Sequence, residues 1–140
     1  MADWTVFALG SAVLAGVTAI LAKIGVEEIP VHLATLVRSA AILAMMAAVT
    51  LATGAWPQLA TLNRRSVVFL ILSGLTAGLS WLCYYRALKT GPVSVIAPLE
   101  KLSLIVAVLL AVAVLGERLA GWQWLGVALM AGGAMLLLVK

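Results

Sequence analysis

Residues 93–115 read VSVIAPLEKLSLIVAVLLAVAVL, and this stretch decides the fold. It is apolar enough and long enough to cross a bilayer as a helix, which takes about 20 residues. Two opposite charges, Glu100 and Lys101, nevertheless stand side by side within it. Ionisable side chains inside a membrane span are costly unless they pair, face a water-filled cavity or lie along a solute path. The stretch therefore predicts a membrane span that carries a candidate functional site.

The composition extends this interpretation to the whole chain. Hydrophobic residues make up 65% of the 140 residues and charged residues only 10%, which is typical of an integral membrane protein. Turn-forming and charged residues separate five apolar runs, at residues 4–22, 31–53, 67–88, 93–115 and 122–139. The connectors are too short for a soluble domain, and the runs are too long and continuous for barrel strands. We therefore predict an all-α membrane protein, a single domain over residues 1–140 with five transmembrane helices.

Several function classes are disfavoured by the residues present. We expect the first run to remain as a helix rather than a cleaved signal peptide, because Asp3 stands where a positive n-region would lie. The nine Lys and Arg residues are spread over helix ends, so no nucleic-acid partner is expected. Cys83 and His32 are the single cysteine and histidine, which excludes an internal disulfide and argues against a metal site. The spans hold no His, Asp and Cys constellation, so we expect no catalytic residues, no enzyme activity and no cofactor.

The loop charges give no preferred orientation. Five spans put the two termini on opposite sides, and the charges then divide three against four. The N-terminal side carries Arg64, Arg65 and Arg118, and the other side carries Lys23, Arg86, Lys89 and Lys140. Either one loop dominates, or the chain inserts both ways. The second possibility favours an antiparallel homodimer, because paired up and down copies reproduce the inverted repeats of many secondary transporters.

Motifs along the chain resemble a known family. They are WLCYYRAL at 81–88, GPVS at 91–94, Pro98, GERL at 116–119, and Gln123 with Gly126 and Gly132-Gly133. In the first half, KIG at 23–25 and LVR at 36–38 are also similar. Together they resemble the EamA family of the drug/metabolite transporter superfamily. The resemblance implies one five-span repeat, where many members carry two repeats and export amino acids or other metabolites. Residues 100–103 are similar to those of single-repeat members.

Helical geometry sorts the polar residues around the two central charges. Small or polar residues spaced three or four apart share a face and predict a cavity lining: Glu100, Ser103, Ala107, Ala111 and Val114. Lys101 lies on another face, and we expect its stem to run along apolar surface to water. The predicted partners of Glu100 are Arg38 and Arg86, and a purely structural ion pair remains the alternative.

Pro98 and the aromatic residues of the third run add to the candidate site. Pro98 removes a backbone hydrogen bond, and the freed carbonyls are candidates to bind a cation or an amino group, although proline kinks are also ordinary packing features. Trp81 lies well inside its span, with Tyr84 and Tyr85 after it. These rings are candidates to stack on a solute or cap a cation, or simply to pack against a neighbouring helix.

Small residues predict which helices approach closely. Gly74 and Gly78 form a Gly-x-x-x-Gly pair in the third run, where we expect packing within the repeat. Ala128 and Gly132 repeat in the same way in the fifth run, either as a dimer contact or as packing within the repeat.

These observations predict a multi-pass secondary transporter of the cell (inner, cytoplasmic) membrane. We expect it to export small polar metabolites or amino-acid-like solutes by alternating access, as an antiparallel homodimer in contact with membrane lipid. The candidate substrate-binding residues are Arg38, Trp81, Tyr85, Arg86, Pro98, Glu100 and Ser103. The alternatives are a flippase for a lipid-linked head group and a non-transporting assembly subunit. They are separated by whether a hydrated cavity reaches Glu100.

Overall fold

The computed structural model describes residues 3–138, which over that range form helices and no strand. The chain divides into two compact units between Lys89 and Thr90. The described part of the chain is therefore all-α, as predicted.

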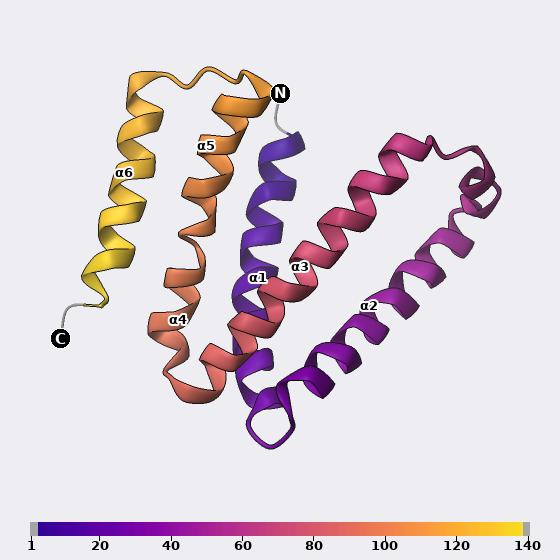
Figure 1. Ribbon diagram of the computed structural model, residues 1–140, viewed down its shortest axis with the longest axis horizontal. Helices are drawn as coiled ribbons and strands as arrows, with labels where there is room; N and C mark the ends of the chain where they lie inside the picture. The colour runs from indigo at the N-terminus through magenta and orange to yellow at the C-terminus, as the bar shows by residue number, and fades with distance from the viewer. Residues whose placement is uncertain (1–2, 139–140) are drawn as a thin grey trace. The chain divides into compact units, whose positions relative to one another are not determined.

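The first unit contains three long helices and one short one (Figure 1). They are α1 (Asp3–Val26), α2 (Val31–Ala52), the 3₁₀ helix η1 (Trp56–Thr61) and α3 (Arg64–Thr90). Pro30 immediately precedes α2, where its fixed φ of −58° and missing N–H suit a helix start. The first three predicted apolar runs are thus helices that extend a few residues beyond the predicted ends of the first and third.

The core of the first unit lies where α1 ends, α2 begins and α3 ends. Its buried residues are Ala19, Val26, Ala34, Thr35, Tyr85 and Leu88. Thr35 is polar, and its hydroxyl donates a hydrogen bond of 2.9 Å to the Val31 carbonyl. The packing that holds the three helices together is therefore concentrated at this end of the unit.

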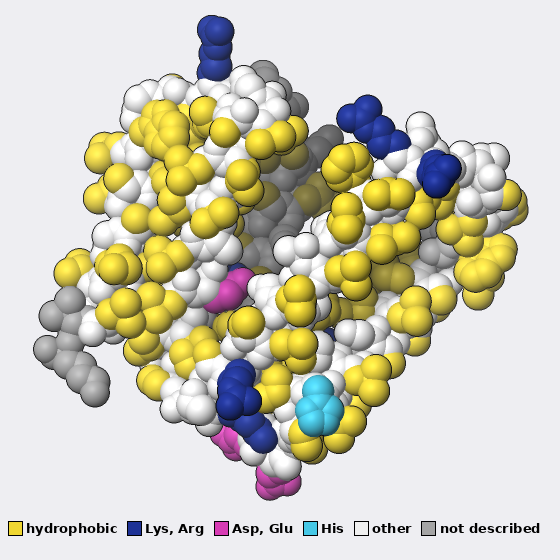
Figure 2. Space-filling view, viewed as in Figure 1, with side chains coloured by type: hydrophobic (Ala, Val, Ile, Leu, Met, Phe, Trp, Pro, Cys, Tyr) yellow, Lys and Arg dark blue, Asp and Glu magenta, His cyan; other side chains and the backbone are white. Residues whose placement is uncertain are grey.

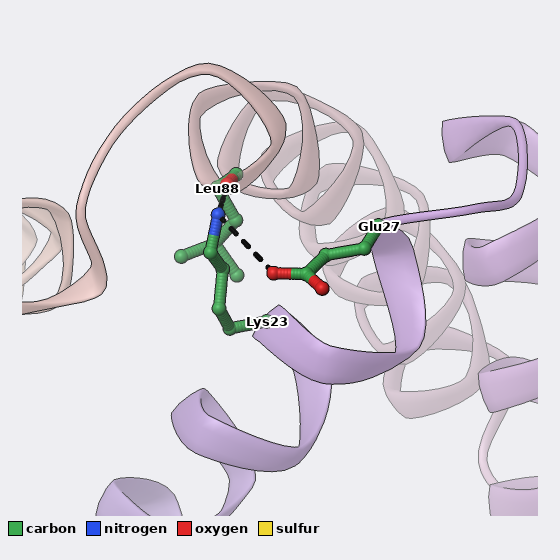
Figure 3. Close-up of polar contacts among 3 residues, drawn as sticks. All are labelled: Lys23, Glu27 and Leu88. Carbon is green, nitrogen blue, oxygen red and sulfur yellow. Dashed lines mark hydrogen bonds and ion pairs between the residues drawn. The ribbon is translucent and has the colours of Figure 1, made fainter.

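Lys23 joins the ends of α1 and α3 (Figure 3). Its Nζ donates a hydrogen bond of 2.7 Å to the Leu88 carbonyl and lies 3.9 Å from Glu27 Oε1. The last four carbonyls of a helix have no partner within the helix, and Leu88 is in the last turn of α3. A cation at this position also complements the negative end of the helix dipole. We call this contact the Lys23 latch.

The second unit contains α4 (Val93–Glu100), α5 (Ser103–Leu115) and α6 (Gly121–Leu136). Within this unit, α4 and α5 follow one another and α6 returns beside them (Figure 1). Gly116 ends α5 with a φ of +70°, the left-handed conformation that glycine adopts without steric cost. The glycine of the GERL motif is therefore the residue that turns the chain from α5 toward α6.

Within residues 3–138, four stretches are long and apolar enough to cross a membrane: Trp4–Val26, Val31–Ala52, Arg64–Thr90 and Val93–Leu115. The fourth corresponds to α4 and α5 together. The predicted count of five is not confirmed, because α6 has only 16 residues. The predicted end of the fifth span, residue 139, and the loop charge Lys140 lie outside the described residues.

Large apolar side chains are exposed along all the long helices, and they cover much of the visible face of each unit (Figure 2). Phe7 in α1, Leu43 in α2 and Leu70 in α3 are examples. In water such surfaces would aggregate, whereas lipid tails or another membrane-embedded chain can cover them. The exposure therefore agrees with a membrane environment.

Within the first unit, the close helix packing predicted at Gly74 and Gly78 is not found, and packing against the rest of the repeat stays a prediction. A Cβ atom built at either position meets no neighbouring atom of that unit within 4 Å. Small residues allow a close approach but do not by themselves supply the partner helix. The same open space surrounds Gly132 in α6.

Candidate functional site

Arg38, Trp81 and Tyr85 come together in the first unit. Arg38 is on α2, and the two aromatic residues lie one turn apart on α3. Arg38 Nη1 donates a hydrogen bond of 2.9 Å to the Tyr85 hydroxyl. Its Cζ lies 4.4 Å from the centroid of the Trp81 ring and 5.9 Å from that of Tyr85. We call these three residues the Arg38 cluster.

The cluster holds a cation at membrane depth. Arg38 is the eighth residue of α2, so its Cα lies about 10 Å along the helix axis from Val31. The side chain is half-buried, and among the described side chains of this unit no carboxylate pairs with it. The faces of Trp81 and Tyr85 compensate part of the charge, because an aromatic quadrupole attracts a cation more strongly where water is scarce.

A cavity of about 640 Å³ opens beside the cluster, between α1 and α2. Its walls are mostly apolar, with Leu21 from α1 and Val37 and Met45 from α2. Arg38 and Tyr85 also line it, and Arg38 is the one charged residue among the described residues that do so. We call it the Arg38 cavity. An apolar cavity of this size with a few convergent polar groups is the usual form of a small-molecule site.

The polar groups at the cavity are mainly hydrogen-bond donors. A guanidinium has five N–H donors and no acceptor, and one of Arg38's donors is used by Tyr85. The Tyr85 hydroxyl accepts that bond and keeps its own O–H to donate. Tyr85 is only 3% exposed, so packing fixes the position of its ring. Thr18, also at the cavity, donates its hydroxyl to the Leu14 carbonyl at 2.8 Å.

In the second unit, Glu100 pairs with its neighbour Lys101. Lys101 Nζ lies 2.7 Å from Glu100 Oε2, and the two side chains are 51% and 37% exposed respectively. The Lys101 ammonium group is therefore paired with the adjacent carboxylate, and its side chain is also half exposed, as expected if its stem runs to water. A pairing of Glu100 with Arg38 or Arg86 stays a prediction.

The helix break that Pro98 predicts is present, but it follows the proline. Pro98 lies within α4, and the chain leaves the α-helix only at Lys101 and Leu102. There the backbone bonds span three residues, with Lys101 N–H to the Pro98 carbonyl at 3.1 Å and Leu102 N–H to the Leu99 carbonyl at 3.0 Å. Short 3₁₀ stretches inside helices often mark hinges, so the second unit contains a candidate flexible point beside Glu100.

The predicted polar stripe of the fourth run is divided. Ala107 and Ala111 line a wholly apolar cavity of about 390 Å³ between α5 and α6, together with Val127 and Met130. Glu100 and Ser103 are not among its lining residues, and Ser103 is exposed. Lys101 and Leu102, whose backbone bonds are of the 3₁₀ type, rotate Glu100 relative to Ser103, whereas the predicted stripe assumes an uninterrupted α-helix.

The structure thus brings three of the predicted site residues together, within one unit. Arg86 follows Tyr85 on α3 and is exposed, and Pro98, Glu100 and Ser103 lie around the break of the second unit. Their roles in substrate binding stay predictions. The sequence interpretation missed the Lys23 latch and the contribution of α1 to the cavity. A lysine four residues before Glu27 was the available signal for an ion pair, but nothing in the sequence pointed to the Leu88 carbonyl.

Comparisons with known proteins agree with the predicted resemblance. Residues 3–139 match the EamA-like transporter family. A relative from Sinorhizobium sp, described as "Uncharacterized transporter in cobO 3'region", is 47% identical over 137 residues, which cover 98% of this chain and 97% of the relative. No solved structure matches the chain. The family match over nearly the whole length confirms the resemblance: the chain belongs to the EamA-like transporter family, as a multi-pass membrane transporter.

Proposed function

We propose that the protein is a secondary transporter that exports small polar, amino-acid-like metabolites across the cell's cytoplasmic membrane. The observation that carries this proposal is the Arg38 cavity, a ligand-sized space with a held cation at membrane depth. Intramembrane ionisable residues usually mark solute paths, and transporter sites lie near the bilayer midplane.

The working unit in this proposal is an antiparallel homodimer of five-span chains. Near-equal loop charges favour insertion in both directions, and α6 would supply most of the fifth span. Alternating access then needs one flexible element in each copy. The 3₁₀ break at Lys101 and Leu102 is a suitable hinge, because it already lacks regular α-helical hydrogen bonds.

Transport is tested with the purified full chain in liposomes. Labelled amino acids and small metabolites are offered with and without a pH gradient, and protein-free liposomes provide the background. We expect saturable uptake of at least one solute class. If no solute of the panel is taken up above background, the transporter proposal fails, and a non-transporting assembly role becomes the better explanation.

Water access to the Arg38 cavity is a separate test. In a Cys83→Ser background, Ala41→Cys places a thiol on the cavity wall, while Leu43→Cys places one on an exposed apolar part of the same helix. We expect a membrane-impermeant thiol reagent to label position 41 faster than position 43. Equal labelling would mean that lipid, not water, fills the cavity.

A further inference from the structure

We propose that the Arg38 cavity recognises the carboxylate of a monovalent anion that has a compact apolar body. This inference rests on the proposed transport function and narrows its solutes to carboxylates that bring no ammonium group into the cavity. The carboxylate would take the place of a counter-ion for Arg38, and the apolar body would contact walls such as Val37 and Met45.

The donors at the cavity select an anion. Among the described side chains of the first unit, no carboxylate pairs with Arg38, whose hydrogen bond to Tyr85 uses only one of its N–H groups. The Tyr85 O–H remains available to donate beside it. A planar carboxylate accepts two bonds from such a pair of donors, whereas an ammonium group would be repelled by the like charge of Arg38.

The number of charges selects a monovalent anion. Arg38 is the one charged residue among the described residues lining the cavity, so a single negative charge is balanced there. A phosphate dianion would bring a second charge into an apolar space with nothing to compensate it, which is costly.

The aromatic contacts preorganise the cation. Stacking on Trp81 at 4.4 Å and bonding to the nearly buried Tyr85 hold the guanidinium plane before a ligand arrives. A long arginine side chain loses less freedom on binding when it is already fixed. The cluster thus acts as a preformed carboxylate receptor.

The first test compares an acid with its amide. Calorimetric titration of the full chain in an uncharged detergent uses 4-methylpentanoate and 4-methylpentanamide, which share one apolar body. We expect the amide to bind at least about tenfold more weakly, since hydrogen bonds to charged groups are stronger. Equal affinities for the two compounds would overturn the proposal.

Variants assign the effect to the cavity. Arg38→Gln should weaken binding of 4-methylpentanoate by at least about tenfold. Arg65→Gln is the matched control, because Arg65 also lies over an aromatic ring, that of Phe69. It should leave the binding of 4-methylpentanoate unchanged, since Arg65 is exposed and does not line the cavity. If Arg38→Gln does not fold, Ala41→Phe fills the cavity and leaves the cluster intact. Wild-type affinity in Ala41→Phe would overturn the proposal.

An anionic lipid is the alternative occupant of the cavity, since phosphatidylglycerol also combines one negative charge with an apolar body. Adding phosphatidylglycerol to the detergent should leave the affinity for 4-methylpentanoate unchanged, and competition by the lipid would overturn the solute assignment. Binding and transport measurements test the carboxylate site and the transporter proposal independently. Carboxylate binding without any transport refutes the transporter and keeps the site, whereas transport with no preference for acids over amides keeps the transporter and refutes the site.

Discussion

Loss of the Lys23 ammonium group should weaken the first unit. Its Nζ donates to the carbonyl of the fully buried Leu88 at 2.7 Å. Lys23→Met keeps most of the stem but leaves that carbonyl without its charged donor. We expect the free energy of unfolding to fall by about 1–2 kcal/mol. The measurement is unfolding of the purified protein by sodium dodecyl sulfate in mixed micelles.

Lys89→Met is the matched control for the Lys23 latch. Lys89 is exposed in the last turn of α3, and it stands on the same predicted side of the membrane as Lys23. Both variants therefore change the loop charge balance equally. Equal unfolding midpoints for the two variants would show that the latch contributes nothing to stability.

Glu100 is predicted to act in transport more than in stability. Its pair with Lys101 is partly exposed, and such pairs contribute about 0–1 kcal/mol. Glu100→Gln should therefore leave the free energy of unfolding within about 1 kcal/mol of wild type and abolish transport, because the amide keeps the size but loses the charge. Glu117→Gln, in the exposed turn after α5, is the control for both measurements. A fully active Glu100→Gln protein would remove Glu100 from the site.

For the Arg38 cluster, the sequence predicted the three residues but not the contacts between them. Sequence alone singled out Arg38, Trp81 and Tyr85, because charged and aromatic residues inside apolar runs are unusual. It did not predict that they contact one another. That contact depends on how α2 and α3 are rotated about their axes, and exposed apolar residues all around a membrane helix leave its rotation unmarked in the sequence.

At the scale of elements, Gly116 is a point of strain for any other residue. With a φ of +70°, an alanine there would adopt a left-handed conformation that costs about 1–2 kcal/mol. Gly116→Ala should lower the unfolding midpoint accordingly. Gly126→Ala is the control, because Gly126 lies within helix α6 with open space around a Cβ, and alanine favours a helix. A Gly116→Ala protein as stable as wild type would mean that the turn rearranges freely.

The helices themselves were largely predictable, whereas their interruptions and contacts were not. Long apolar runs bounded by proline, glycine and charge have few alternatives in a membrane, so the starts of α2 at Val31 and α4 at Val93 were predicted correctly. The helix break was predicted at Pro98, but it begins three residues later, at Lys101. Proline determines which backbone hydrogen bond is missing, but it does not determine at which residue the α-helix is interrupted. The pair Gly74 and Gly78 allowed a close helix contact that is not made within the first unit.

At the scale of the whole molecule, topology is the property that the loop charges control. If a charge division of three against four lets the chain insert both ways, removing two charges from one side should fix it. Arg64→Gln with Arg65→Gln leaves one against four. Reporter fusions after Lys140 decide the orientation, with alkaline phosphatase active outside the cell and green fluorescent protein fluorescent inside. We expect both reporters to be active on the wild-type chain and only one on the double variant.

A second double variant separates charge balance from damage to the α3 start. Arg65→Gln with Lys89→Gln removes one charge from each side and keeps the difference at one, as in the wild type. Since the positive-inside rule responds to the difference between loops, this chain should still activate both reporters. If the wild-type chain activates a single reporter, dual topology is wrong, and an antiparallel homodimer has no means of forming. Inverted copies would then have to come from a different partner chain, because the symmetry that places a site between opposed repeats needs both orientations in one membrane.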